Sequence, residues 1–196
     1  MWPWEHVVVG YVVYSLASHL LRHESPRGGE ALVVAFASLL PDLVDKPLAW
    51  SLGVVETGYG PAHSVFFTLP FVAVVLTAWA TTGRPWRGVA FAVGYLLHLP
   101  SDVLHNATGR GGFAPEIVLW PVRAYTGATP SAGFIQESIV RAASFRTQVL
   151  AGDLSLYTRV QFGLFALAVV LWVVDGAPVL RESVQRTRAL FGVEAE

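Results

Sequence analysis

The segment GYLLHLPSD, residues 94–102, places a histidine and an aspartate four positions apart in an otherwise apolar run. On an α-helix, positions i and i+4 lie above one another on the same face. His98 and Asp102 would then offer an imidazole nitrogen and a carboxylate oxygen as adjacent ligands for a divalent metal. A buried hydrogen bond between the two side chains, without metal, is the competing interpretation. Pro100 leaves another alternative open, in which the helix ends near His98.

The composition indicates that this segment belongs to a membrane protein. Of 196 residues, 54% are hydrophobic and 14% are charged, against about 25% charged residues in ordinary soluble domains. Aromatic residues make up 12%, including seven Trp, which suits side chains at the membrane interfaces. The formal net charge of −1 argues against a nucleic-acid-binding protein, which needs a basic face. The chain has no cysteine, so only His, Asp and Glu could bind a metal.

The distribution of apolar runs predicts an all-α fold, a polytopic membrane helical bundle. About four full transmembrane helices are expected over charge-poor runs near residues 3–21, 63–81, 87–105 and 159–176. A fifth run covers only residues 31–40 and is followed by PDLVDKP, too short to cross about 30 Å of hydrocarbon. Either a helix carries the two aspartates on to Trp50, or the segment is re-entrant. We therefore expect a short or re-entrant helix near residues 31–49.

Two segments with apolar residues at helical spacing among charged ones predict amphipathic surface helices, at 134–150 and in the tail. The expected organisation is one membrane-embedded domain, residues 1–176, with a loop and surface-helix insertion at 106–157. Residues 177–196 form an amphipathic C-terminal tail, whose arginines favour a cytoplasmic location. The glycine-rich loop 108–116 is a candidate gate to a site, and Glu116 in it is a candidate for acid–base help.

Other polar residues interrupt the apolar segments of the first half of the chain. They are His6, the LLPD sequence at residues 39–42 followed by Asp45, and the His-Ser pair at 63–64. An unpaired carboxylate at the centre of a bilayer costs about 2.5–3.5 kcal/mol. Several such residues are hard to explain without a compensating cation.

Taken in order with residues 94–102 and Trp120-Pro121, these motifs resemble the membrane-bound metal-dependent hydrolase family (the DUF457 group, with LexA-regulated inner-membrane members). The resemblance covers residues 6–121, and it extends more distantly to the zinc-dependent phospholipase C and S1-type nuclease fold, an all-helical bundle. It implies a divalent metal, with zinc as the leading candidate. The implied ligands are Asp42, His63, His98 and Asp102, with His6 as a further ligand. Asp42, Asp45 and Glu116 are the implied catalytic candidates.

The chain departs from the family pattern at two places. The sequence GYGPAHS, residues 58–64, lacks the first histidine, the arginine and the threonine of the family motif His-Arg-Gly-x-Thr-His-Ser. The aspartates at 42 and 45 are one residue further apart than in the family's Asp-x-Asp. Both departures bear on whether the site is catalytically competent.

The function expected from these features is a metal-dependent hydrolase in the cytoplasmic membrane of a prokaryote. A metal-activated water would cleave a phosphoester of a lipid or lipid-like molecule, and the bilayer itself would be the other partner. A non-catalytic membrane protein with a structural or vestigial His/Asp metal site is the alternative. Ion transport is a third possibility, disfavoured because no inverted repeat is evident. The sequence selects neither a substrate nor an oligomeric state.

Overall fold

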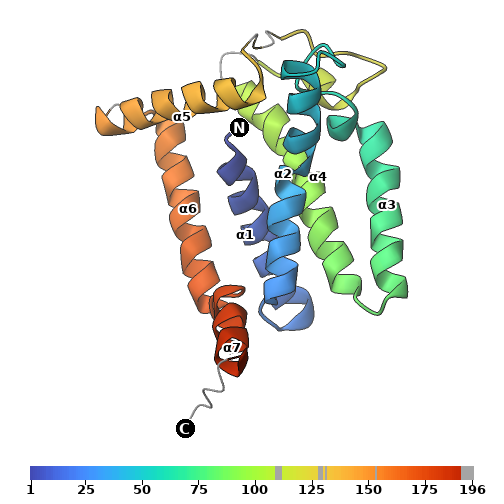
Figure 1. Cartoon of the computed structure of the whole chain (residues 1–196), viewed down its shortest axis with the longest axis vertical. Helices are drawn as coiled ribbons and strands as arrows, with labels where there is room; N and C mark the ends of the chain where they lie inside the picture. The colour runs from blue at the N-terminus through green and yellow to red at the C-terminus, as the bar shows by residue number, and fades with distance from the viewer. Residues whose placement is uncertain (109–111, 128–129, 131, 153, 191–196) are drawn as a thin grey trace.

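The computed structural model describes residues 1–108, 112–127, 130, 132–152 and 154–190, and every regular element in those ranges is helical. Five long helices run roughly along one axis: α1 (Pro3–Arg22), α2 (Gly28–Trp50), α3 (Val65–Thr81), α4 (Pro85–Thr108) and α6 (Leu156–Val174) (Figure 1). Helix α5 (Phe134–Leu150) lies across one end of this bundle, and α7 (Leu180–Leu190) lies at the other. Two short 3-10 helices, η1 (Pro61–His63) and η2 (Pro115–Val118), lie in the connections. The predicted all-α fold is confirmed.

Helices lie at all four places where membrane spans were expected. Among the described helices, α6 alone is both long enough and apolar enough to cross a membrane by length and composition. Helix α3 is apolar but has only 17 residues. Helices α5 and α7 occupy the two segments expected to be surface helices, and neither contains a buried residue.

Of the two alternatives for residues 31–49, the helix that carries both aspartates on to Trp50 is confirmed, and the short or re-entrant segment is wrong, because α2 is one continuous helix of 23 residues. It continues through both Pro41 and Pro47. Proline removes the helical hydrogen bond to the carbonyl four residues back, which for Pro41 is that of Ala37. One residue further on, the carbonyl of Ser38 accepts a hydrogen bond from His98 Nδ1 at 2.7 Å, so α4 contacts α2 in the turn before Pro41.

Helix α4 also continues past its internal proline, Pro100, and extends to Thr108. The alternative in which it ends near His98 is therefore excluded. His98 and Asp102 lie one turn apart and are both 1% exposed, as the i, i+4 spacing predicts.

The centre of the bundle is a close packing of α1, α2 and α4. A Cβ atom on Gly94 would lie 2.6 Å from the carbonyl oxygen of Val34, and one on Gly10 would lie 2.3 Å from Ser38 Oγ. Only glycine fits at such contacts. The close approach brings the polar residues of α2 and α4 within reach of each other.

Polar contacts attach α6 to α1 at both ends. Near the start of α6, the buried carboxylate of Glu5 accepts hydrogen bonds from Tyr157, at 2.6 Å, and from Gln161. Just beyond its other end, the buried carboxylate of Asp175 accepts from Tyr11 at 2.7 Å. It also accepts from Ser15, at 2.8 Å, and pairs with His19 at 2.6 Å. Helix α6 itself buries only Gln161 and Ala168, so these contacts set its position.

Candidate metal centre

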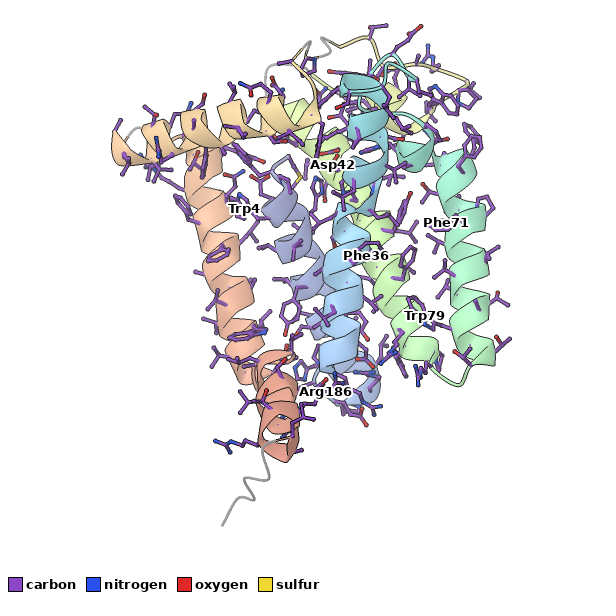
Figure 2. All side chains as sticks on the ribbon, viewed as in Figure 1. Trp4, Phe36, Asp42, Phe71, Trp79 and Arg186 are labelled. Atoms are coloured by element: carbon purple, nitrogen blue, oxygen red, sulfur yellow. The ribbon has the colours of Figure 1, made fainter. Side chains whose placement is uncertain are left out.

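Four polar side chains converge inside the bundle, near the end that α5 covers, where Figure 2 labels Asp42. One ligand atom from each of Asp42, His63, His98 and Asp102 lies within 4.8 Å of all the others. Their side chains come from α2, from η1 and, for the last two, from α4. None of the four is more than 4% exposed. The structure therefore brings together the four residues that the resemblance implied as ligands.

The hydrogen bonds of the two histidines determine which ring nitrogen faces the centre of the cluster. His63 Nδ1 lies 2.8 Å from Asp45 Oδ2, and His98 Nδ1 lies 2.7 Å from the carbonyl oxygen of Ser38. Carboxylate and carbonyl oxygens only accept hydrogen bonds, so in both rings Nδ1 carries the proton. In the neutral rings each Nε2 then presents a lone pair, and the two Nε2 atoms face each other at 3.1 Å.

Two carboxylate oxygens complete the cluster. Asp42 Oδ1 and Asp102 Oδ2 are buried and have no hydrogen-bond partner among the described residues. The Nε2 atom of His63 lies 3.5 Å from each of these oxygens, and that of His98 lies 3.6 and 3.5 Å from them. Four electron-rich atoms this close, away from water, repel one another unless a proton or a metal cation lies between them.

These separations fit a divalent metal. Ligands about 2.0–2.1 Å from a tetrahedral zinc ion lie about 3.3 Å from one another. The five measured separations run from 3.1 to 3.6 Å. Two imidazoles and two carboxylates are also a donor set that zinc accepts. The cluster could therefore hold a metal ion, and these distances do not identify which divalent metal it would be.

Asp45 lies behind His63 rather than in the cluster. Its carboxylate accepts backbone N–H groups of Gly60, at 2.8 Å, of Ala62, at 3.1 Å, and of His63, at 3.0 Å, besides the imidazole Nδ1–H. It thus holds both the η1 backbone and the histidine ring in place, as carboxylates commonly do for metal-binding histidines. The spacing of three residues along α2 is what turns Asp42 toward the cluster and Asp45 toward η1.

The surrounding charges act on His63, which lies in η1 between the long helices. Burial by itself lowers the pKa of this imidazole, but the neighbouring carboxylates of Asp102, Asp42 and Asp45 outweigh it and raise the pKa of His63 to about 10. Tyr59 packs edge-on against this ring, with centroids 5.0 Å apart. Burial, together with the charges of Asp102 and Asp42, raises the pKa of Tyr59 well above its usual range. The site therefore favours a cation, and its nearest phenol remains neutral.

The remaining predicted site residues lie at different distances from the cluster. His6 stacks on His98 with ring centroids 3.7 Å apart, and its Nε2 lies 3.3 Å from Asp102 Oδ1, so it is beside the four converging groups. Glu116 pairs with Arg123 at 3.6 Å and is not brought into the cluster. The candidate gate at 108–116 lies partly outside the described residues.

Two polar side chains near the cluster, Ser64 and Tyr95, bond to backbone carbonyls and not to the histidine rings. Ser64 donates to the carbonyl of Trp120, which ties η1 to the Trp-Pro segment, and Tyr95 donates to the carbonyl of Ala62 at 2.8 Å. Neither contacts a histidine nitrogen. Asp45 and the Ser38 carbonyl do so instead.

A cavity of about 810 Å³ opens beside the cluster, beneath α5. Asp42 and Lys46 form part of its wall, and the Lys46 ammonium donates a hydrogen bond to Asp42 Oδ2. The apolar wall includes Trp4, Trp50 and Phe134. The cluster is thus closed on most sides but borders, through Asp42, a space large enough for a small molecule.

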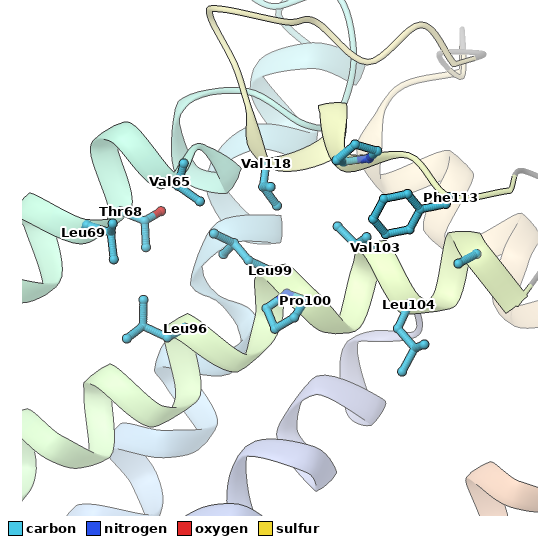
Figure 3. A pocket seen from close by; sticks show the side chains of 12 residues that line it. Val65, Thr68, Leu69, Leu96, Leu99, Pro100, Val103, Leu104, Phe113 and Val118 are labelled. Carbon is cyan, nitrogen blue, oxygen red and sulfur yellow. The ribbon is translucent and has the colours of Figure 1, made fainter.

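A separate apolar pocket of about 530 Å³ lies between α3 and α4 (Figure 3). Val65, Leu99 and Phe113 line it together with other uncharged residues. Because no titratable side chain lines this pocket, it has no group for acid–base or metal chemistry. The cavity beside Asp42 is therefore the candidate reaction site.

The sequence model of the YdjM inner membrane protein family matches residues 1–179. The chain belongs to the YdjM inner membrane protein family. Membership supports the membrane location that the composition indicates. It also supports the motif resemblance over residues 6–121. No curated protein and no solved structure matches the chain, so the more distant similarity to phospholipase C and S1-type nucleases finds no support.

Several residues of this YdjM family member that shape the site were not identified from the sequence. Lys46 and His105 are two of them. Both line the cavity beside Asp42. Arg141 of α5 lines it as well, although Arg141 is far from Asp42 in the sequence. An i, i+4 relation to Asp42 was the one local signal that pointed to Lys46.

Proposed function

We propose that the protein is a metal-dependent hydrolase of a prokaryotic cytoplasmic membrane that cleaves a phosphoester of a lipid or lipid-like molecule. The observation that carries this proposal is the convergence of two imidazole lone pairs and two unpartnered carboxylate oxygens beside a cavity. A divalent ion held there, with zinc as the leading candidate, would lower the pKa of a bound water to about 7 and polarise a phosphoryl oxygen. Family membership supports the membrane location, and the cavity supports access by a substrate.

The residues of the chain divide into three roles under this proposal. Asp42, His63, His98 and Asp102 would hold the ion. Asp45 and the Ser38 carbonyl keep the two Nε2 lone pairs directed inward. Lys46 binds one oxygen of Asp42 and leaves the other facing the cluster. Asp42 is the ligand that borders both the cluster and the cavity, whereas Asp45 is a positioning residue.

We further propose that the long helices lie in the membrane, with residues 1–176 as one embedded domain. Exposed apolar side chains along α3 and α6, such as Leu69, Val74 and Val170, support this arrangement. Helix α5, which lies across the bundle (Figure 1), would then lie at one membrane surface. The arginine-containing tail from residue 177 would lie in the cytoplasm.

A structural metal site is the second candidate function. The observation that favours it is the burial of all four ligand groups, none more than 4% exposed. Four protein ligands without an open position are typical of structural zinc. Under this alternative the metal stabilises the packing of α2, η1 and α4, and the cavity beside Asp42 takes no part in chemistry.

One experiment separates the two candidates. Detergent-purified protein, stripped of metal and reloaded with zinc, is assayed for bound metal and for hydrolysis of bis(4-nitrophenyl) phosphate and 4-nitrophenyl phosphate. We expect wild type to bind zinc and hydrolyse at least one ester, and Asp102→Asn to lose both properties. Glu24→Gln is the matched control, because Glu24 is a surface carboxylate paired only with Arg27 in the described contacts. Bound zinc without hydrolysis would favour the structural role, and no bound metal would refute the site.

A further inference from the structure

A second hollow, of about 530 Å³, lies between α1, α4 and α6. Its wall is mainly apolar and includes Val8, Leu104, Val160 and Leu164. It follows α6 from Leu156 to Leu164, nine residues whose ends are about 12 Å apart along the helix. We call this hollow the α6 groove. Its shape and lining suit an extended hydrocarbon chain.

The α6 groove adjoins the cavity beside Asp42. Trp4 and His105 line both hollows, and so does Met1. His105 also packs against the ring of Tyr157, with centroids 5.0 Å apart. A molecule could therefore reach from Asp42, past His105, into the space beside α6.

The charges of the two hollows differ. The cavity beside Asp42 carries the cations Lys46 and Arg141, both over the ring of Trp50, at 5.7 and 5.6 Å from its centroid. The α6 groove contains one carboxylate, Glu5, whose oxygens are occupied by Tyr157 and Gln161. Lys46 is paired with Asp42, and Arg141 with Glu137 at 2.7 Å. An anionic group entering the cavity would therefore share these two cations with their carboxylates, whereas the groove suits an uncharged chain.

We infer that the two hollows form one binding site for an anionic amphiphile, with its phosphate group beside Asp42 and its hydrocarbon chain in the α6 groove. The inference rests on the proposed function for what happens at the phosphate, and it adds where the chain binds. The site determines specificity through chain length, because the groove accommodates only the part of a chain that fits along α6. Access is from the side of the bundle, past α6, rather than through α5.

The test measures binding of methyl, butyl, octyl and dodecyl phosphate to zinc-loaded protein in lipid nanodiscs. Each methylene transferred from water to the groove should strengthen binding about fourfold, and the gain should level off beyond about 12 Å of chain. Leu164→Trp fills the groove. Leu167→Trp is the matched control, because Leu167 lies on the same helix, is 44% exposed and does not line the groove. Farnesyl phosphate beside dodecyl phosphate distinguishes an isoprenoid chain from a linear one.

We expect wild type and Leu167→Trp to share the same dependence on chain length, while Leu164→Trp loses it and still binds methyl phosphate. Since alkyl phosphates partition equally into the nanodisc lipid for all three proteins, partitioning cannot produce this difference. Equal chain-length dependence in the three proteins would overturn the inference, as would failure of every alkyl phosphate to bind. If the pattern holds but no 4-nitrophenyl ester is hydrolysed, the amphiphile site stands and the proposed hydrolase function fails.

Discussion

Replacing Asp45 tests how far the zinc affinity depends on a residue that is not itself a ligand. In wild type, Asp45 Oδ2 accepts three hydrogen bonds, from Gly60 N, His63 N and His63 Nδ1, and Oδ1 accepts one, from Ala62 N. In Asp45→Asn the amide oxygen is expected at the Oδ2 position, where it satisfies three donors. The bond to Ala62 is lost, and the bond to the imidazole becomes neutral.

The magnitude follows from these contacts. A hydrogen bond to a charged group contributes about 1.5–3 kcal/mol and a neutral one about 0.5–1.5 kcal/mol. The hydrogen bond that orients the imidazole therefore contributes about 1–1.5 kcal/mol less in the variant. Asp45→Asn should therefore weaken zinc binding about tenfold. Asp45→Ala removes the acceptor altogether and should weaken it about 100-fold, the upper end for such partners.

The assay is competition for zinc against a chromophoric chelator, with the helical content of each metal-free variant measured by circular dichroism. Glu24→Gln serves again as the control, and its affinity should equal that of wild type. The reasoning is refuted if folded Asp45→Ala binds zinc as tightly as wild type, because the Nδ1 contact would then have no influence on the ligand nitrogen.

Two further predictions concern pH and packing. Because the raised pKa, about 10, keeps His63 protonated at neutral pH in the metal-free protein, zinc must displace that proton, so affinity should rise about tenfold per pH unit between pH 6.5 and 8.5. Chelator competition across that range checks this, and a flat profile would contradict it. Gly94→Ala places a Cβ 2.6 Å from the Val34 carbonyl oxygen and should lower the free energy of unfolding by about 1–3 kcal/mol. Gly163→Ala, on α6 with open space around it, should not lower it; thermal unfolding of both variants in one detergent makes the comparison, and equal losses would argue against the close packing of α2 and α4.

The sequence predicted the helices from local patterns, and the ligand set from the motifs that carry the family resemblance. Charge-poor runs identify helices wherever the surroundings are apolar, and an i, i+4 pair shares a face in any helix. Polar residues inside such runs are conspicuous, and the resemblance of their order to the family pattern implied His63, His98 and the aspartates at 42 and 102 before their distances were known. Continuity of α2 through Pro41 could not be predicted in the same way, since proline by itself favours the end of a helix.

What the sequence by itself determined was therefore the all-helical class, the approximate positions of the helices and the chemical types gathered at the site. Tertiary structure alone decided that Asp45 turns away from the cluster to hold His63, and that α5 covers the cavity beside Asp42. It also decided that a groove along α6 adjoins this cavity. The physical reason is that hydrophobic periodicity and helical spacing act over a few residues, whereas the enclosure of a cavity depends on helices that are far apart in the chain.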